Sequence, residues 1–348
     1  MSFAVKSVAA DRLPDLLRRM PKAELHMHIE GSLEPELIFA LAERNHLPLA
    51  YPDVKTLRKA YAFTNLQSFL DIYYAGASVL ITSQDFYDMT WAYLVKAAAD
   101  EVLHTEIFFD PQTHTARGVG MATVIDGLHR ACVDAQEELG ISASLIMCFL
   151  RHLSEEDAFE TLEQAMPHRD KLIGIGLDSG EVGNPPEKFA RVFARCRKLG
   201  FHLVAHAGEE GPPAYVWTAL DVLKVERVDH GVQSSKDAAL MRRLAKDRIA
   251  LTVCPLSNLK LCVFPDLASH NLRELLDAGL AATVNSDDPA YFGGYISDNF
   301  TQTFAASSAL NAKHAYTLAR NSFEASFIDD AAKRGHINRL DEVFETFQ

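Results

Sequence analysis

Eight short runs of apolar and often β-branched residues recur along the chain, and they restrict its possible folds more than any other feature. Each run has the length of one strand that is buried on both faces. The runs are AELHMHI at 23–29, LHTEIFF at 103–109, SASLIMCFL at 142–150, LIGIGLD at 172–178, FHLVAHA at 201–207, RVDHG at 227–231, IALTVCP at 249–255 and AATVNSD at 281–287. Most gaps between them show helical periodicity. The sequence therefore predicts an α/β protein with a (β/α)8 TIM barrel, and a doubly wound open sheet is the alternative.

The gap after the first run is the longest, and two of its stretches, PELIFALAERNHLPL and AYAFTNLQSFLDIYYAGASVL, read as helical. Insertions after a barrel strand lie over the active face, so residues 31–102 are predicted to form a helical, lid-like insertion. Since no linker or change of composition divides the chain, residues 1–348 are interpreted as one domain. Five aromatic residues of the insertion either roof a pocket or belong to the core: Tyr61, Phe63, Phe69, Tyr73 and Tyr74.

The clearest helical pattern is NPPEKFARVFARCRKLG, residues 184–200. Asn184 suits a helix N-cap, and the two prolines that follow suit a first turn. Gly200 suits the position just after a helix end. The pattern predicts one helix from Asn184 to Gly200.

Composition narrows the class of partner. The formal net charge of −13 argues against nucleic acid, because its binding depends on clustered Lys and Arg. No apolar window is long enough for a signal peptide or a membrane span. Five cysteines without a C-x-x-C pair fit reduced thiols. We expect a cytoplasmic protein with a small-molecule partner, no nucleic acid and no membrane; the sequence does not indicate the oligomeric state.

Two histidines share one face of the first predicted strand. His26 and His28 alternate with the apolar Leu25, Met27 and Ile29, and a strand repeats every two residues. In a small barrel this face points inward. A single buried histidine is most often a hydrogen-bonded core residue, whereas two leave several ring nitrogens without partners. A metal ion satisfies them together, since imidazole is the commonest metal ligand.

Polar side chains also lie at the ends of three later strands. His206 ends the fifth run and Glu209 follows it, His230 ends the sixth, and Asp287 and Asp288 end the eighth. Barrel enzymes assemble their sites at these carboxyl ends. Adjacent acids are often only a solvated loop pair. At a strand end their side chains diverge, so one can bind a metal while the other faces a ligand.

The candidate metal ligands combine three imidazoles with one carboxylate: His26, His28, His206 and Asp287. This set suits one Zn²⁺ per chain with a position open for water, and iron or another divalent ion is the alternative. A two-metal barrel would need a bridging ligand, commonly a modified lysine near the end of the fourth strand, and LIGIGLDSG has no lysine. Because a metal lowers the pKa of water, His230 is predicted to orient that water and Glu209 to act as general acid and base.

The motifs ELHMHIEGS, HAGEEG, RVDHG, CPLSNLKL and VNSDDPAYFG together resemble the adenosine/adenine deaminase family of metal-dependent amidohydrolases. They run in the family's order across most of the chain. The resemblance implies a zinc-dependent barrel that replaces a purine amino group with oxygen. By this resemblance the four candidate ligands match the family's zinc ligands, Glu209 its proton donor and His230 its water-orienting histidine. Asp288 matches the carboxylate that hydrogen-bonds the purine N7.

Three departures from adenosine-specific members concern the substrate. Those members usually carry Asp where this chain has Glu30, which is one methylene longer and would reach into the space of the sugar. The turn after the fourth strand reads GLDSGEVGNPPEKF instead of DLAGDE, and the segment NLQSFLDIYYAGASVL is closer to the adenine-specific branch. In that turn Gly180 matches the backbone N–H that meets the purine N3, with Ser179 and Glu181 as alternative contacts at the N9 edge.

The resemblance thus implies an adenine deaminase that converts adenine to hypoxanthine and ammonia in purine salvage. An adenosine deaminase, which produces inosine, and a deaminase of an N6-substituted adenine are the nearest alternatives. A phosphotriesterase or lactonase would share the H-x-H strand but would normally need the bridging lysine. A binding protein that has lost its chemistry is disfavoured, since every expected catalytic position is filled. The remaining histidines, His114 among them, are interpreted as structural.

Overall fold

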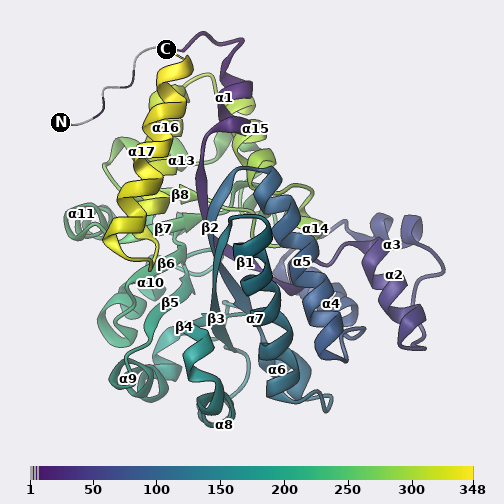
Figure 1. Cartoon of the computed structure of the whole chain (residues 1–348). Helices are drawn as coiled ribbons and strands as arrows, with labels where there is room; N and C mark the ends of the chain where they lie inside the picture. The colour runs from purple at the N-terminus through teal and green to yellow at the C-terminus, as the bar shows by residue number, and fades with distance from the viewer. Residues whose placement is uncertain (1–2, 4, 6–7, 348) are drawn as a thin grey trace.

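Eight parallel strands form one sheet in the computed structural model, which describes residues 3, 5 and 8–347. Residues 1, 2, 4, 6, 7 and 348 of the predicted domain lie outside this description. The strands are β1 (Lys22–His28), β2 (Val102–Phe109), β3 (Ser142–Leu150), β4 (Leu172–Asp178), β5 (His202–Ala207), β6 (Arg227–His230), β7 (Ala250–Val253) and β8 (Ala281–Val284). They pair in sequence order from β1 to β8 (Figure 1). This order confirms the barrel and excludes the doubly wound sheet, whose strand order reverses.

The sheet closes between β8 and β1 through the segment that follows β8. The backbone N–H of Asp287 donates to the carbonyl of His26 at 3.1 Å, and the N–H of His28 donates to the carbonyl of Asp287 at 2.9 Å. The side-chain amide oxygen of Asn285 accepts from the N–H of Leu25 at 2.9 Å. Barrel closure therefore fixes Asp287 directly beside the two histidines of β1.

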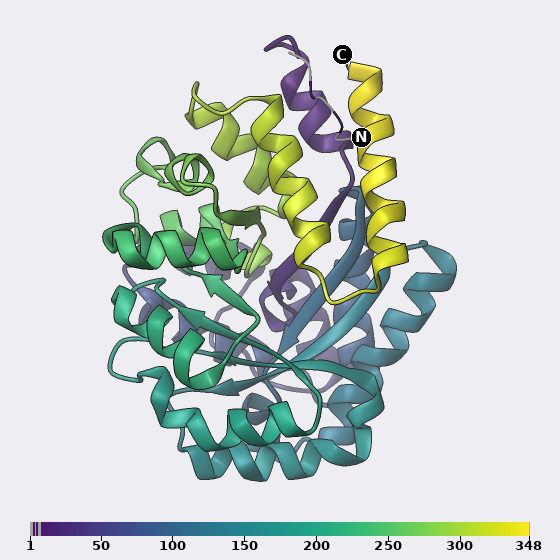
Figure 2. The same ribbon diagram turned by 90° about the vertical axis from the view of Figure 1, so that its left-hand side faces the viewer.

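Helices surround the strands, and Figure 2 shows them on the outside of the sheet. Between β1 and β2 lie α2 (Pro35–Arg44), α3 (Val54–Ala60), α4 (Leu66–Ala77) and α5 (Ser83–Ala99). The other α-helices are α1 (Leu13–Arg19), α6 (Pro111–Thr115), α7 (Met121–Glu138), α8 (Glu155–Ala165), α9 (Ala190–Lys198), α10 (Pro213–Thr218), α11 (Ala238–Asp247), α12 (Pro255–Lys260), α13 (Leu272–Asp277), α14 (Pro289–Phe292), α15 (Ile296–Ala306), α16 (Ala312–Ala325) and α17 (Asp330–Phe347). Short helical turns are η1 (Glu30–Ser32), η2 (Met166–Lys171), η3 (Pro186–Phe189), η4 (Ala219–Leu223), η5 (Val232–Lys236) and η6 (Leu267–Ser269).

The strands are buried along nearly their whole length because side chains of the barrel interior cover one face and the helices cover the other. The apolar runs of the sequence follow from this double burial. Across the part of the chain that the structure describes, every helix is too short or too polar to span a bilayer.

The predicted helix at 184–200 differs from the observed one at its start. Pro186–Phe189 form the 3-10 turn η3, and α9 begins only at Ala190. Asn184 caps no helix; its side-chain amide donates to the carbonyl of Gly180 at 3.0 Å instead. Gly200 follows the helix end with a φ of 82°, as the sequence predicts.

The segment between β1 and β2 contributes a second, smaller apolar cluster. Phe69 and Tyr73 of α4 pack there against Tyr291 and Phe292 of α14. Asn65 caps the N-terminus of α4 in a capping box with Ser68. The cluster ties α4 to the loop after β8, which carries Asp287 and Asp288.

Candidate active site

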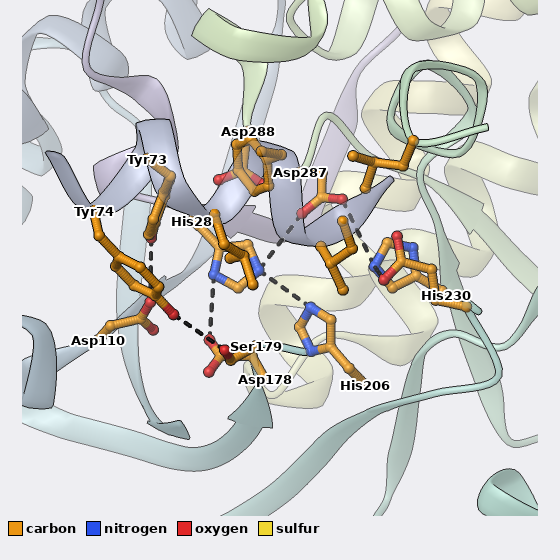
Figure 3. Close-up of a pocket in the computed structure, with 15 residues that line it drawn as sticks. His28, Tyr73, Tyr74, Asp110, Asp178, Ser179, His206, His230, Asp287 and Asp288 are labelled. Atoms are coloured by element: carbon orange, nitrogen blue, oxygen red, sulfur yellow. Dashed lines mark hydrogen bonds and ion pairs between the residues drawn. The ribbon is translucent and has the colours of Figure 1, made fainter. Parts of the chain in front are cut away.

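The four predicted metal ligands converge at the carboxyl ends of β1 and β5 and in the loop after β8. Nε2 of His26 lies 3.2 Å from Oδ1 of Asp287, and Nε2 of His28 lies 3.5 Å from the same oxygen. Nε2 of His206 lies 3.2 Å from Nε2 of His28. All four side chains are buried, and their ligand atoms lie within 4.8 Å of one another. Figure 3 shows three of them, with Asp287 and His206 on either side of the His28 ring nitrogen.

The spacing of these atoms fits a tetrahedral ion. Ligand atoms about 2.0–2.2 Å from Zn²⁺ in a tetrahedral arrangement lie roughly 3.3–3.6 Å apart. The observed separations of 3.2 Å and 3.5 Å agree with this geometry. Nε2 of His26 is buried and has no hydrogen-bond partner, which is costly unless a ligand satisfies it. Three imidazoles and one carboxylate are also the donor types that divalent zinc prefers.

Outer groups orient the imidazoles from behind. Nδ1 of His26 lies 2.9 Å from the hydroxyl of Thr252, which in turn donates to Asp229 at 2.9 Å. The other carboxylate oxygen of Asp229 lies 3.6 Å from Nδ1 of His206. One buried carboxylate on β6 thus lies behind two ligand histidines: it acts on His26 through Thr252, and it approaches His206 at a distance longer than a hydrogen bond.

His28 has its own outer partner. Its Nδ1 lies 3.5 Å from Oδ2 of Asp178, the last residue of β4. Both carboxylates, Asp178 and Asp229, come from strands whose ends carry no ligand of their own. Neither role was predicted from the sequence, because each residue is an ordinary acid at a strand end until the fold places it behind a histidine.

Two site residues adopt left-handed backbone conformations. His230 has a φ of 61° and Asp287 a φ of 65°. Residues other than glycine rarely adopt this region, and such strain is found mainly at functional sites, where the surroundings enforce it. Gly31 is required nearby, since a Cβ there would come within 1.9 Å of Oδ1 of Asp288.

Glu209 and His230 lie beside the ligand cluster. Nε2 of His230 is 3.5 Å from Oε2 of Glu209 and 3.6 Å from Oδ2 of Asp287. On its other side, Nδ1 of His230 lies 3.4 Å from the side-chain amide nitrogen of Asn258, whose oxygen lies 3.2 Å from Nε2 of His270. Asn258 belongs to the CPLSNLKL motif, so this motif contributes the group that orients His230.

Burial and neighbouring charges set the protonation of these groups. Burial, together with the charge of Asp287, raises the pKa of Glu209 well above its usual value. The same two causes raise the pKa of Asp288 well above its usual value. Burial, with the charge of His26, lowers the pKa of His230 to about 3. The site therefore presents two carboxyl groups that retain protons beside a neutral imidazole.

Glu181 holds the turn that carries Glu209. Its buried carboxylate accepts hydrogen bonds from four consecutive backbone N–H groups, at 2.6, 3.0, 3.0 and 2.8 Å, which belong to Gly208, Glu209, Glu210 and Gly211. Glu181 is therefore fully used inside the protein. This differs from the prediction of a contact with the purine N9 edge.

The pocket above the ligands is small, with a cavity volume of about 30 Å³. Among the predicted site residues it is lined by His28, His206, Glu209, His230, Asp287 and Asp288. From α4 it is lined by Leu66, Phe69, Leu70, Tyr73 and Tyr74. Three of the five predicted roof aromatics thus face the pocket. The other two, Tyr61 and Phe63, stack on each other within the smaller apolar cluster. Asp110, Asp178 and Ser179 complete the polar lining with Leu261.

Two predicted substrate contacts do not line the pocket. The carboxylate of Glu30 is buried against protein: it accepts from Nε2 of His114 at 2.7 Å and from the N–H of Asp110 at 3.2 Å. Gly180 also lies off the pocket wall, and its carbonyl accepts from Asn184. His114 and Asp110 thus hold the carboxylate of Glu30 within the protein. His114, interpreted from the sequence as structural, is the partner that holds Glu30.

A parallel eight-stranded barrel with this cluster at its strand ends defines an amidohydrolase-type protein. The chain belongs to the adenosine deaminase family, whose family model matches residues 21–343. This confirms the family resemblance of the motifs and identifies the chain as an enzyme of the hydrolytic deaminase class.

Relatives extend the similarity along nearly the whole chain. A protein named adenine deaminase from Albidiferax ferrireducens is 72% identical over 346 residues, 99% of this chain and 100% of that protein. The crystal structure of an adenine deaminase from Arthrobacter aurescens is 51% identical, covers 94% of this chain and 99% of its own, and has a TM-score of 0.92. An amidohydrolase from Burkhoderia ambifaria, solved with bound Zn, is 27% identical with a TM-score of 0.88, over 98% of this chain and 96% of its own.

Proposed function

We propose that this enzyme hydrolyses free adenine to hypoxanthine and ammonia. In this reaction a C6–O bond forms, the C6–N bond of the amino group breaks, and the nitrogen leaves as ammonia. The observation that carries the proposal is the position of Glu209, His230 and Asp288 around one buried cluster of metal-ligand type, inside a small roofed pocket. The high identity to proteins named adenine deaminase supports the same substrate.

His26, His28, His206 and Asp287 would hold one divalent ion, which we propose to be zinc. When bound, such an ion polarises water so that it becomes a nucleophile at neutral pH. The donor set, the atom spacing and the bound Zn of the related amidohydrolase support this choice.

The remaining polar groups act on the purine and on the attacking water. Glu209 holds a proton at Oε and delivers it to N1 of the base, which makes C6 more electrophilic. His230 orients the water through Nε2: the side-chain amide nitrogen of Asn258 donates to Nδ1, so in the neutral ring Nε2 carries the hydrogen and donates it to the water oxygen. Asp288 holds N7 by a hydrogen bond, and thereby fixes the ring plane for attack.

The roof over the pocket suits a flat base without a sugar. Phe69, Tyr73 and Tyr74 of α4 cover the cavity with aromatic rings, and Leu66 and Leu70 add apolar surface. We propose that residues 31–102 act as a cover that excludes water during the reaction. The lining offers aromatic and carboxyl groups at the edge where a nucleoside carries its ribose.

A purine panel tests the function. Zinc-loaded enzyme is assayed for ammonia release with adenine, adenosine and N6-methyladenine. We expect the kcat/KM for adenine to exceed that for adenosine at least tens of times, because unmatched polar groups in a closed pocket cost a few kcal/mol. Comparable values for adenine and adenosine would contradict the proposed substrate. Faster release of methylamine from N6-methyladenine would favour the modified base.

A further inference from the structure

We propose that Asp110 binds the N9–H of the free base and thereby selects bases over nucleosides, an inference that rests on the proposed function. Asp110 follows directly after β2, lines the pocket and is 3% exposed. Free adenine carries a hydrogen on N9, whereas a nucleoside carries its sugar there. A buried carboxylate oxygen at this edge distinguishes the two chemically.

One oxygen of Asp110 is available for a ligand. Its Oδ2 accepts from the hydroxyl of Tyr73 at 3.2 Å, while Oδ1 is buried without a hydrogen-bond partner. A buried acceptor without a donor is costly, and the cost is removed when a ligand supplies an N–H. Tyr73 is buried in α4, the helix that covers the pocket. Oδ2 of Asp110, which accepts its hydrogen bond, is therefore held from the side of this helix.

The neighbouring carboxylate has a different role. Asp178 also lines the pocket, and both its oxygens are buried without a hydrogen-bond partner, but its Oδ2 lies 3.5 Å from Nδ1 of His28, on the side of the candidate metal ligands. Of the two adjacent acids, Asp110 is therefore the one that does not serve a candidate metal ligand. Ser179, the next polar group on the wall, is engaged by Tyr74 at 3.1 Å and by His152 at 2.8 Å.

The placement of Asp110 matches the far edge of the base. Figure 3 shows Tyr73 and Asp110 on one side of His28 and His230 on the other. A base whose N1 faces Glu209 and whose N7 faces Asp288 directs C6 toward the ligand cluster. Its N3 and N9 atoms then point away from the reaction centre, toward the side of the pocket that Asp110 lines.

This arrangement also gives Glu30 a role that it does not have as a direct contact. Oε1 of Glu30 accepts from the backbone N–H of Asp110 at 3.2 Å, and the hydroxyl of Tyr73 lies 3.4 Å from Oε2. His114 holds the same carboxylate at 2.7 Å. Glu30 is therefore a positioning residue, which sets the place of Asp110 and Tyr73.

Substrate analogues combined with a side-chain truncation test the proposal. We compare kcat/KM for adenine and 9-methyladenine in the wild type and in Asp110→Ala. The wild type should prefer adenine by at least roughly 100-fold. Asp110→Ala should lower the value for adenine by roughly 3- to 10-fold, since it removes one hydrogen bond to the base. The value for 9-methyladenine should stay or rise, so the ratio between the two substrates should approach one.

Equilibrium binding provides a readout that does not depend on turnover. Calorimetry measures the dissociation constants of hypoxanthine and 9-methylhypoxanthine. In Asp110→Ala the ratio of these two constants should also approach one. Asp71→Ala, at an exposed acid of α4 that does not line the pocket, is the control and should leave both ratios as in the wild type, whereas Ser179→Ala tests the next polar group on the same wall. If Asp110→Ala weakens both members of each pair equally, or if Ser179→Ala changes the ratios instead, the assignment of Asp110 is wrong. If the wild type deaminates neither purine, the proposed function itself fails.

Discussion

The carboxylate of Glu181 accepts a hydrogen bond from the backbone N–H of Glu209 at 3.0 Å, across 28 residues of sequence. Three adjacent N–H groups donate to the same carboxylate. Gly211 leaves room for it, since a Cβ there would come within 2.5 Å of Oε1 of Glu181. The proposed proton donor is thus held on a turn whose shape depends on one buried acid from another strand end.

Glu181→Gln should lower kcat because an amide has only one acceptor oxygen for four donors. We expect a loss of roughly 10- to 100-fold, as one or two N–H groups become unpaired or the turn shifts. Zinc content by atomic emission should remain one per chain, since Glu181 is not a predicted ligand. The same exchange at Glu187, on the turn that precedes α9, is the control and should leave kcat unchanged. A fall in zinc content parallel to the fall in kcat would contradict a positioning role.

Glu209→Gln should abolish turnover while the metal remains bound. The substitution removes a proton donor and no ligand, so a loss of roughly 10²- to 10⁴-fold in kcat is expected. Paired measurements of ammonia release and zinc content separate the two effects. Glu210→Gln, at the next position of the same turn, should cost far less. Survival of most activity in Glu209→Gln would show that another group moves the proton.

Two substitutions should lower the affinity for the metal by different amounts. His206→Ala removes a predicted ligand and should nearly eliminate zinc binding. Asp229→Ala removes no predicted ligand but the group behind His206 and Thr252, together with a buried ion pair to Arg227, and should weaken affinity by roughly 10- to 100-fold. Competition with a chromophoric chelator measures both values. Equal losses in the two variants would mean that Asp229 supports the fold and not the orientation of the imidazoles.

His270 should make the enzyme less stable in mild acid. Burial lowers the pKa of His270 to about 4, from 6.5 for a free side chain. Below pH 6.5 the unfolded chain therefore binds a proton that the folded chain does not, and the free energy of unfolding falls as the pH falls toward 4. The contribution is at most about 3 kcal/mol over this window.

His270→Gln removes this titration. Urea unfolding between pH 7.5 and 4 should therefore show a smaller decline for the variant than for the wild type. The difference at pH 7.5 measures the structural cost of losing the contact with Asn258. Parallel stability curves for the two proteins would show that His270 takes up its proton equally in the folded and unfolded states.

Local patterns in the sequence predicted much of the fold. The strand runs predict β3 and β4 at their observed bounds, because a strand buried on both faces must be apolar throughout. The predicted start of α9 was wrong. Pro185 and Pro186 suit a first helical turn equally well as α or 3-10 helix, and only the packing of the turn separates the two.

The candidate metal cluster also follows from sequence, since a strand's alternation places His26 and His28 on one face and barrel geometry gathers the other strand ends. The groups that orient it do not. Asp229 and Thr252 carry no local signal, because they are ordinary residues until β6 and β7 pair. The sequence showed Asn258 only as part of the CPLSNLKL motif and did not indicate that it contacts His230.

The substrate edge of the pocket shows the same division. The sequence by itself determined that an acid longer than Asp follows the histidine pair, and that this acid bears on the choice of purine. Only the tertiary structure decided how, because the partners of Glu30 are distant in the chain: His114 lies 84 residues away and Asp110 lies 80 residues away. A side chain's reach is a local property, but whether it meets ligand or protein depends on which strands close the barrel around it.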